Sequence, residues 1–316
     1  MKKPYIIGVG VSGTRVTYGL FDNRGAIVYR RQHPTNTKAD GSEMSDQIVE
    51  NISVLLRENN LSSDNLKGVG VCMPSHILYD EGVVLMTSAM PAIKDFRMRD
   101  YLRERLHTTV MLDNSASGAS LAEHRHGAGR GARHMVYIKV GAGLGSGIII
   151  DGNVFKGSYG WAGEIGHMLC TPDEGVLCGC ENKGCFMSYV AGKNIPDRVK
   201  AGIDKGIKSI LTPDSTDGYL LNEAYKAGDP LASYIIDLMA NHLAVCVFNV
   251  YQMLNINTYV FGGRLANFGG VFLELVRKEF NKYNHIQLPV HFRLAELDQD
   301  IGIIGAAEMI EMIDDD

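Results

Sequence analysis

Residues 135–157 read MVYIKVGAGLGSGIIIDGNVFKG, and this stretch decides the fold class. Its apolar runs are separated first by a glycine-rich turn and then by an Asp-Gly turn, which is the pattern of three short strands joined by hairpins. Residues 5–32 show the same order, with the first turn at Gly13-Thr14. Two copies of this meander in one chain predict two similar lobes, each with a glycine-rich hairpin.

Around the two meanders, apolar runs typical of buried strands alternate with runs of helical periodicity. Further strands are expected at 68–73, at 110–113 and from 258 into a glycine turn. Helices are expected from Ser42, at 96–107, from Asn114 to Arg125, at 219–227, at 230–254 and from Gly302 to Met312. This alternation predicts an α/β protein. We place an N-terminal lobe at 1–113, joined by a closing helix at 302–316, and a larger C-terminal lobe at 114–301.

The composition is that of a protein with a large core and a mild negative charge. The chain has 316 residues, 45% hydrophobic content and a formal net charge of −5, which is compatible with about two domains. It opens MKKPYIIGVGV without a long apolar signal region, and no run approaches the roughly 20 apolar residues of a membrane span. We therefore expect a cytoplasmic protein with no membrane partner. The lack of a basic cluster predicts no nucleic-acid partner.

Cysteines are concentrated in one segment, Gly163–Cys185, which reads GEIGHMLCTPDEGVLCGCENKGC and holds four of the six cysteines. One imidazole and three thiolates are the ligands that zinc takes in closed structural sites. The residues that match such a site are His167, Cys178, Cys180 and Cys185. Cys170 is then a spare. A reducing cytosol disfavours disulfides, which favours zinc as the explanation. The alternative is four reduced cysteines in a glycine-rich loop.

Four motifs, VGVSGT, VGAGLGSG, AGEIGH and CGCENKGC, follow one another in the chain. In this order and spacing they resemble the ROK family, named for repressor, open reading frame and kinase. The resemblance covers nearly the whole chain and implies the two-lobed actin/hexokinase-like (ribonuclease H-like) fold. Many members are bacterial sugar kinases that use ATP and magnesium. Others are repressors with an additional N-terminal helix-turn-helix, and we expect no such function here because the chain opens directly on its first strand.

The loops that bind phosphate in the family are altered in this chain. The family's first loop reads Asp-x-Gly-Gly-Thr, and here Gly10 stands in place of the magnesium-binding aspartate. In the second loop Ala142 replaces a phosphate-binding hydroxyl. The loop positions that the resemblance retains as vestigial nucleotide contacts are Gly13, Thr14, Gly141, Gly143, Gly262 and Gly263. The alternative is that these glycines only form tight turns. ATP and magnesium are therefore doubtful cofactors.

The position of the catalytic base is also changed. Family kinases read Glu-Asn-Asp-Ala-Asn, with the aspartate as general base, whereas this chain reads Asp113-Asn114-Ser115 at the matching place. A serine hydroxyl has no useful basicity near neutral pH. Asp113 is a candidate to take over the role. The alternative for Asn114 and Ser115 is an ordinary helix cap.

The sugar side of the resemblance is better preserved. Glu164 and His167 match the family's Glu-x-Gly-His, in which both residues bind sugar hydroxyls and the histidine also holds zinc. Asn114 matches a sugar-contacting asparagine. Met187 departs from the pattern, because the family has a sugar-binding glutamate there. The alternatives are a solvated Glu164 and a histidine that only binds metal.

Two further side chains are candidates for the ligand region. His76 lies in Pro74-Ser75-His76, where the family usually has a Pro-Gly loop, and a surface or structural role is the alternative. Trp161 is the only tryptophan of the chain and could stack on a sugar face or pack in the core.

Three classes of function follow. The first is a carbohydrate-binding protein derived from a sugar kinase and deficient in phosphoryl transfer. The second is an active, glucokinase-like hexose kinase with altered residues, and the third is a hydrolase or isomerase that uses Glu164 and His167. A sugar or sugar derivative is the expected ligand in each class. The long helices at 219–254 and the family pattern predict a homodimer.

Overall fold

The computed structural model describes residues 4–172, 175–214, 216–264 and 268–314, and they form two compact units. Unit 1 consists of Met1–Arg130, Gly147–Ala162 and Leu297–Asp316. Unit 2 consists of Gly131–Ser146 and Gly163–Glu296. Residues 1–3 of the expected first lobe and residues 315 and 316 of its closing helix lie outside the described residues.

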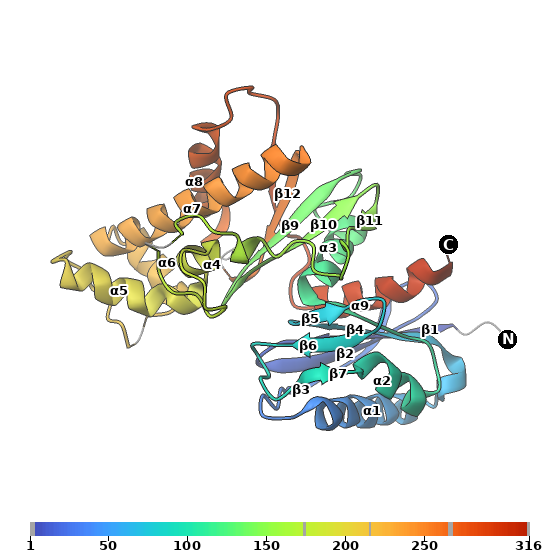
Figure 1. Ribbon diagram of the computed structural model, residues 1–316. Helices are drawn as coiled ribbons and strands as arrows, with labels where there is room; N and C mark the ends of the chain where they lie inside the picture. The colour runs from blue at the N-terminus through green and yellow to red at the C-terminus, as the bar shows by residue number, and fades with distance from the viewer. Residues whose placement is uncertain (1–3, 173–174, 215, 265–267, 315–316) are drawn as a thin grey trace. The chain divides into compact units, whose positions relative to one another are not determined.

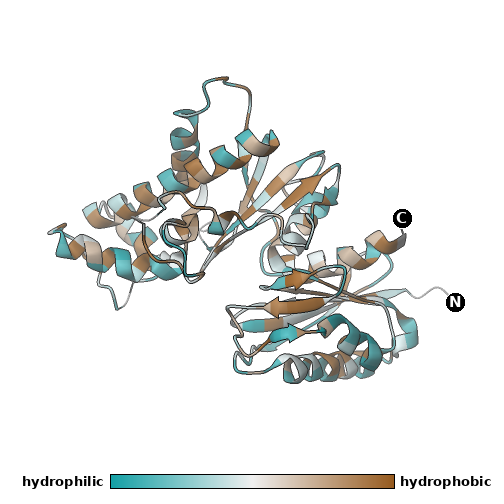
Figure 2. Cartoon of the chain, in the orientation of Figure 1, coloured by the Kyte–Doolittle hydropathy of each residue, from teal (hydrophilic) through white to brown (hydrophobic). Residues whose placement is uncertain are grey.

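A five-stranded sheet with the order β3-β2-β1-β4-β8 forms the centre of unit 1 (Figure 1). Its strands are β1 (Tyr5–Val11), β2 (Arg15–Phe21), β3 (Ile27–Pro34), β4 (Leu66–Met73) and β8 (Val110–Asn114). The first three strands are the antiparallel meander predicted from the sequence, with Ile7 opposite Leu20. β4 pairs parallel to β1, and β8 pairs parallel to β4. Figure 2 shows hydrophobic residues along the strands of this sheet.

Helices α1 (Gly41–Glu58) and α2 (Met98–Leu106) pack on one face of the sheet. A capping box begins α1: Asp40 accepts a hydrogen bond from the backbone N–H of Glu43, whose side chain accepts one from the backbone N–H of Asp40. The buried side of α1 is formed by Met44, Ile48, Ile52 and Leu55, which share a core cluster with the strands. Spacings of three and four residues place them on one face of the helix.

Helix α9 (Ile301–Glu311) covers the opposite face, and glycines in the sheet allow its backbone to pack there directly. A Cβ atom at Gly8 would lie 2.1 Å from the carbonyl oxygen of Ile303. One at Gly70 would lie 1.7 Å from the carbonyl oxygen of Ala306. The two positions must therefore be glycine, since no side chain fits between strand and helix.

A small antiparallel sheet of β5 (His76–Leu78), β6 (Val83–Met86) and β7 (Lys94–Phe96) completes unit 1. The sequence patterns did not predict it, because strands of three or four residues are too short to show a period of two. It carries the expected candidate His76 on its first strand.

The second meander begins the sheet of order β11-β10-β9-β12-β13. Its strands are β9 (Met135–Val140), β10 (Leu144–Ile150), β11 (Asn153–Val154), β12 (Thr258–Gly262) and β13 (His291–Leu294). The helices of unit 2 are α4 (Phe186–Val190), α5 (Ile195–Asp204), α6 (Gly218–Lys226), α7 (Pro230–Leu254) and α8 (Gly269–Asn281). Among the described residues, α7 is the one helix long and apolar enough to cross a membrane. It packs against the other four helices of unit 2, and 56% of its most apolar window is buried, as in a core helix.

The boundary between the units differs from the expected one at residues 113 and 114. Helix α3 (Ser115–His126) belongs to unit 1 because it packs closely on α9. A Cβ atom at Gly305 would lie 2.1 Å from the carbonyl oxygen of Gly118, so the two helices are almost in backbone contact. Residues 147–162 also belong to unit 1, and the chain passes between the units within β10.

Candidate functional site

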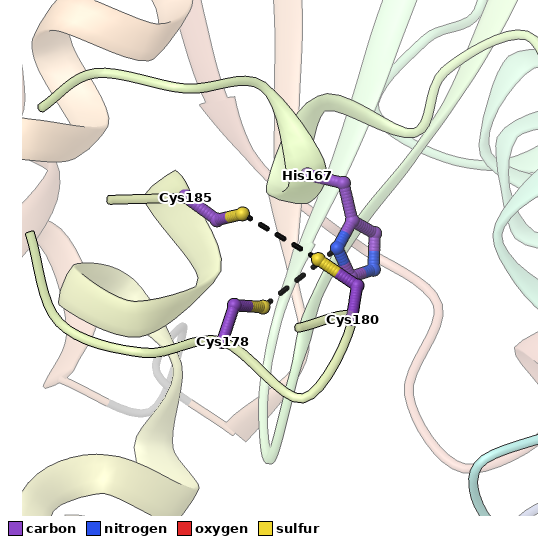
Figure 3. Close-up of side chains that lie close together, drawn as sticks. All are labelled: His167, Cys178, Cys180 and Cys185. Carbon is purple, nitrogen blue, oxygen red and sulfur yellow. Dashed lines mark hydrogen bonds between the residues drawn. The ribbon is translucent and has the colours of Figure 1, made fainter. Parts of the chain in front are cut away.

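The four expected metal ligands lie together in unit 2 (Figure 3). Their ligand atoms are all within 4.8 Å of one another: Nδ1 of His167 and the Sγ atoms of Cys178, Cys180 and Cys185. Sγ of Cys178 is 3.8 Å from Nδ1 of His167, and Sγ of Cys180 is 3.6 Å from that of Cys185. Cys170 is not in this group; its thiol donates to the carbonyl oxygen of Gly184 at 3.1 Å.

The geometry of this cluster fits a tetrahedral ion. Zn–S bonds of about 2.3 Å in a tetrahedron place neighbouring sulfur atoms about 3.8 Å apart, close to the separations observed. Three thiols and one imidazole are also soft ligands of the kind that zinc prefers. The cluster can therefore hold a metal ion with little movement of its ligands.

The thiols strongly influence one another's ionisation. Burial, together with the neighbouring Cys180 and Cys178, raises the pKa of Cys185 to about 12. Burial also opposes ionisation of Cys180, but hydrogen bonds from the backbone N–H of Asn182 and from the other ligands lower its pKa to about 6. A divalent cation would stabilise all three thiolates at once, since metal binding releases their protons.

Backbone hydrogen bonds shape the knuckle that carries the cysteines. The backbone N–H of Cys178 donates to the carbonyl oxygen of Asn182 at 2.8 Å, which closes the turn between the ligands. Gly184 has a φ of +75°, and a Cβ atom there would lie 2.0 Å from the carbonyl oxygen of Thr171. Only glycine therefore fits at position 184, immediately before Cys185.

Glu164 directly precedes a short 3₁₀ turn, η2 (Ile165–His167), which ends at the metal ligand His167. Gly163 begins the turn with a φ of +98°, and Oγ of Ser146 donates to its carbonyl oxygen at 2.6 Å. Nε2 of His167 points away from the thiols (Figure 3). The Glu164 carboxylate has no hydrogen-bond partner among the residues that the structure describes. A carboxylate and an imidazole nitrogen are thus both available to a ligand.

Met187 connects the glycine hairpin to helix α4. Its Sδ atom accepts a hydrogen bond from the backbone N–H of Leu144 at 3.1 Å. The backbone N–H of Gly141 donates to the carbonyl oxygen of Gly143 at 2.8 Å, and that of Gly192 donates to the carbonyl oxygen of Gly141 at 2.8 Å. The amides of Gly141 and Leu144 are therefore engaged within unit 2, so a phosphate would have to compete for them.

The expected base position lies in unit 1, at the start of α3. Asn114 caps the helix: its Oδ1 accepts from the backbone N–H of Ala116 at 2.7 Å, and its Nδ2 donates to the carbonyl oxygen of Ser75 at 2.8 Å. One N–H of the amide remains for a ligand. The Asn114 side chain therefore has a structural role that the sequence left as an alternative.

Asp113 is buried and forms an ion pair with Lys156. Burial raises the pKa of Asp113 above its usual value and outweighs Lys156 and the backbone N–H of Asn114, which lower it. Nζ of Lys156 also lies 4.3 Å from the ring centroid of Tyr79. Both carboxylate oxygens are engaged, so Asp113 is poorly suited to accept a proton from a sugar. Lys156 was not among the residues indicated by sequence patterns, because this contact joins residues 43 positions apart.

The turn expected as the first phosphate loop is held by Ser12. Its Oγ accepts hydrogen bonds from the backbone N–H groups of Thr14 at 3.3 Å and Arg15 at 3.1 Å. Its backbone N–H donates to the carbonyl oxygen of Arg15 at 2.9 Å. The serine side chain therefore occupies the place that an anion would take at these amides.

The Gly262-Gly263 turn is required for packing within unit 2. A Cβ atom at Gly262 would lie 2.2 Å from Oη of Tyr137. Gly263 has a φ of +89°, and a Cβ atom there would lie 2.5 Å from the carbonyl oxygen of Val140. Both glycines thus allow close approach of β12 to β9, whether or not a nucleotide binds.

Comparisons with known proteins agree over nearly the whole chain. Residues 6–312 match the ROK family. The chain is 30% identical to a glucokinase of Halalkalibacterium halodurans over 318 residues, which covers 98% of this chain and 96% of that protein.

Two solved structures are similar as well. A ROK hexokinase from Thermus thermophilus has a TM-score of 0.83 at 26% identity and covers 98% of this chain and 99% of its own. A ROK glucokinase from Streptomyces griseus, in complex with glucose and AMPPNP, has a TM-score of 0.79 at 25% identity, with the same coverage. The expected actin/hexokinase-like α/β fold is therefore confirmed. With its motifs, its fold and its relatives in agreement, the chain belongs to the ROK family.

Proposed function

We propose that this sugar-kinase-like ROK protein binds a sugar or sugar derivative and is deficient in phosphoryl transfer. The observation that carries the proposal is the state of the base position. Ser115 offers no carboxylate, and the neighbouring Asp113 is buried and paired with Lys156. Loss of a general base alone removes about 10²–10⁴ in rate.

The phosphate-binding loops support the same conclusion. Gly10 supplies no carboxylate for magnesium, and a Cβ atom there would lie only 3.2 Å from the backbone of Gly302. The Ser12 side chain occupies amides of the first turn, and Met187 occupies one amide of the second. Three separate parts of the phosphoryl-transfer machinery are altered, which makes ATP and magnesium poor candidates for cofactors.

The sugar side retains groups suited to hydroxyls. In unit 2 we assign Glu164 and Nε2 of His167 to the ligand. In unit 1, the remaining N–H of Asn114 is available to a hydroxyl. The Glu164 carboxylate supports this role, because it has no hydrogen-bond partner among the described residues and a hydroxyl would satisfy it. The related S. griseus glucokinase was solved with glucose, so a hexose is the first ligand to test.

We also propose that the metal is zinc and that its role is structural. Zinc held by Nδ1 of His167 and the three cysteines would fix the orientation of the imidazole and leave Nε2 for the ligand. No open coordination position is needed, since four protein ligands complete a tetrahedron.

A panel of hexoses tests the proposal in two assays on the same protein. ADP release is measured with ATP and magnesium, and the shift of the melting temperature is measured for each sugar and for ATP. We expect a sugar to raise the melting temperature without ADP release. Glu164→Gln, which keeps size but removes the charge, should lose the sugar-dependent shift.

Two results would overturn this assignment. Turnover at ordinary kinase rates, about 1–100 per second, would show an active hexose kinase. Cleavage of chromogenic glycosides without nucleotide, lost in Glu164→Gln, would instead show a carbohydrate-active enzyme that uses Glu164 and His167.

A further inference from the structure

Unit 1 exposes a cluster of aromatic rings that the proposed sugar site does not use. It consists of His76 on β5 together with Tyr159 and Trp161, and we call it the aromatic surface. The ring centroids of Tyr159 and Trp161 are 5.8 Å apart, and those of His76 and Trp161 are 5.5 Å apart at an angle of 90°. Tyr159 is 66% exposed and Trp161 is 37% exposed. Such rings are costly to leave in water, and grouped exposed apolar side chains mark binding sites.

The aromatic surface is held rigidly. Nε1 of Trp161 donates to the carbonyl oxygen of Ile77 at 2.9 Å, which fixes the orientation of the indole. Gly160 has a φ of +94°, and a Cβ atom there would lie 2.8 Å from Cβ of Tyr79. The segment therefore packs closely on the residues around β5. Rigid rings lose little entropy when a ligand covers them.

The loop that carries Tyr159 and Trp161 is connected at its ends to a buried ion pair. The backbone N–H of Ala162 donates to the carbonyl oxygen of Lys156 at 3.1 Å, which closes the loop that carries Tyr159 and Trp161. Lys156 is in turn paired with the buried Asp113. The ion pair that disables Asp113 as a base thus has a second effect, since it holds the loop in place.

Polar groups at the edge of the surface identify the kind of ligand. Among the residues that the structure describes, neither Oη of Tyr159 nor either ring nitrogen of His76 has a hydrogen-bond partner. Flat apolar faces bordered by free hydroxyl and imidazole groups suit a ligand with C–H groups on its face and hydroxyls on its edge. A pyranose ring has this form, whereas a lipid chain or an apolar protein surface would leave the edge groups unpaired.

We propose that the aromatic surface is a second carbohydrate-binding site, which takes a pyranose ring of a disaccharide or longer glycoside. This inference takes its ligand class from the proposed function, but the site is built from unit 1 residues alone and does not need Glu164.

Fluorescence provides a direct test because Trp161 is the only tryptophan of the chain. The full-length protein is titrated with cellobiose and with glucose, and emission and acrylamide quenching are recorded. Stacking of a ring on Trp161 should shift the emission to shorter wavelength and reduce quenching. Tyr159→Ala and His76→Ala keep the tryptophan and should weaken cellobiose binding roughly three- to tenfold each, as expected for loss of an aromatic contact.

Glu164→Gln separates this inference from the proposed function. The variant should lose the melting-temperature shift with hexoses and keep the fluorescence response to cellobiose. A response that disappears in Glu164→Gln, or no response of the wild-type protein to either sugar, would overturn the second site. A spectral change on dilution without sugar would also overturn it, because the rings would then be covered by another copy of the chain.

Discussion

Single residues determine what chemistry this ROK protein can perform. Ser115 stands where a carboxylate is needed, and it begins a helix whose cap is made by Asn114. Asp113 cannot readily replace it, because Lys156 and the backbone N–H of Asn114 engage its oxygens. In unit 2, the Glu164 carboxylate has no hydrogen-bond partner among the described residues. The proposed loss of kinase activity and retention of sugar binding both depend on these few side chains.

A carboxylate restored at position 115 tests whether the missing general base limits phosphoryl transfer. We expect Ser115→Asp to raise hexose-dependent ADP release by up to about 10²-fold, because a positioned base contributes about 10²–10⁴ while the altered phosphate loops remain limiting. Coupled-enzyme detection of ADP measures it. Ser115→Asn is the matched uncharged control and should stay at the wild-type level. An equal rise in both variants would contradict the assignment.

At the scale of elements, short irregular segments carry the site and regular elements hold them in place. Within the described residues 175–185, the knuckle around Cys178 and Cys180 has no helix or strand and depends on glycines and backbone hydrogen bonds. Helix α4 begins directly after Cys185, and its Met187 reaches the glycine hairpin. Helix α7 supports this unit, since α4, α5, α6 and α8 all pack against it.

The knuckle should lose its metal when one exposed ligand is changed. In Cys180→Ser we expect zinc to fall below one ion per chain and the melting temperature to fall by several degrees, because metal-binding energy is folding energy and each 1 kcal/mol shifts the midpoint about 2–4 °C in a domain of this size. Elemental analysis and calorimetry measure both effects. Cys170→Ser is the matched control and should retain zinc. Full zinc in Cys180→Ser would require a different ligand set.

The cap at the start of α7 makes the stability of the folded protein depend on pH. Asp229 caps this helix, accepting hydrogen bonds from the backbone N–H groups of Ala232 and Ile210, both at 2.8 Å, and from Oγ of Ser209 at 2.9 Å. Burial raises the pKa of Asp229, but these bonds outweigh it and lower the pKa below its usual 3.8. A lowered pKa means that the ionised form stabilises the folded state above the unfolded pKa, and this contribution is lost as the pH falls through the folded value.

Asp229→Asn should therefore be less stable than the wild type at pH 7, by about 1–2 kcal/mol, with the difference shrinking below pH 4. Urea unfolding at pH 7, 5 and 3.5 measures the difference. Asp22→Asn is a useful comparison, because that carboxylate caps only an exposed turn through Arg24 and Ala26. A constant difference between Asp229→Asn and the wild type at all three pH values would contradict the role of ionisation.

The whole molecule is two compact α/β units, each built on one of the two meanders. At the level of the whole molecule, we expect two copies of the chain to form a homodimer. Two tyrosines on the helices of the 219–254 region are exposed, Tyr219 at 70% and Tyr234 at 44%. Large exposed rings on neighbouring helices are common at subunit interfaces.

Light scattering coupled to gel filtration measures the assembly. We expect a mass of twice the chain's 34.6 kDa, and Tyr219→Glu should shift the equilibrium toward the monomer because a charge is costly in a buried interface. Tyr159→Glu, a similarly exposed tyrosine in unit 1, should leave the mass unchanged. A monomeric wild type at micromolar concentration would contradict the expectation.

The local structure and the family could be inferred from the amino-acid sequence alone. Turn glycines, alternating apolar runs and helix caps predicted both meanders and the position of α7, because these features depend on neighbours a few residues away. The ligand spacing around Cys178 also indicated the metal cluster. The contacts between distant side chains became apparent only in the folded structure. Lys156 with Asp113, Met187 with Leu144, and Trp161 with His76 join segments 43 to 85 residues apart, and no local pattern encodes such contacts.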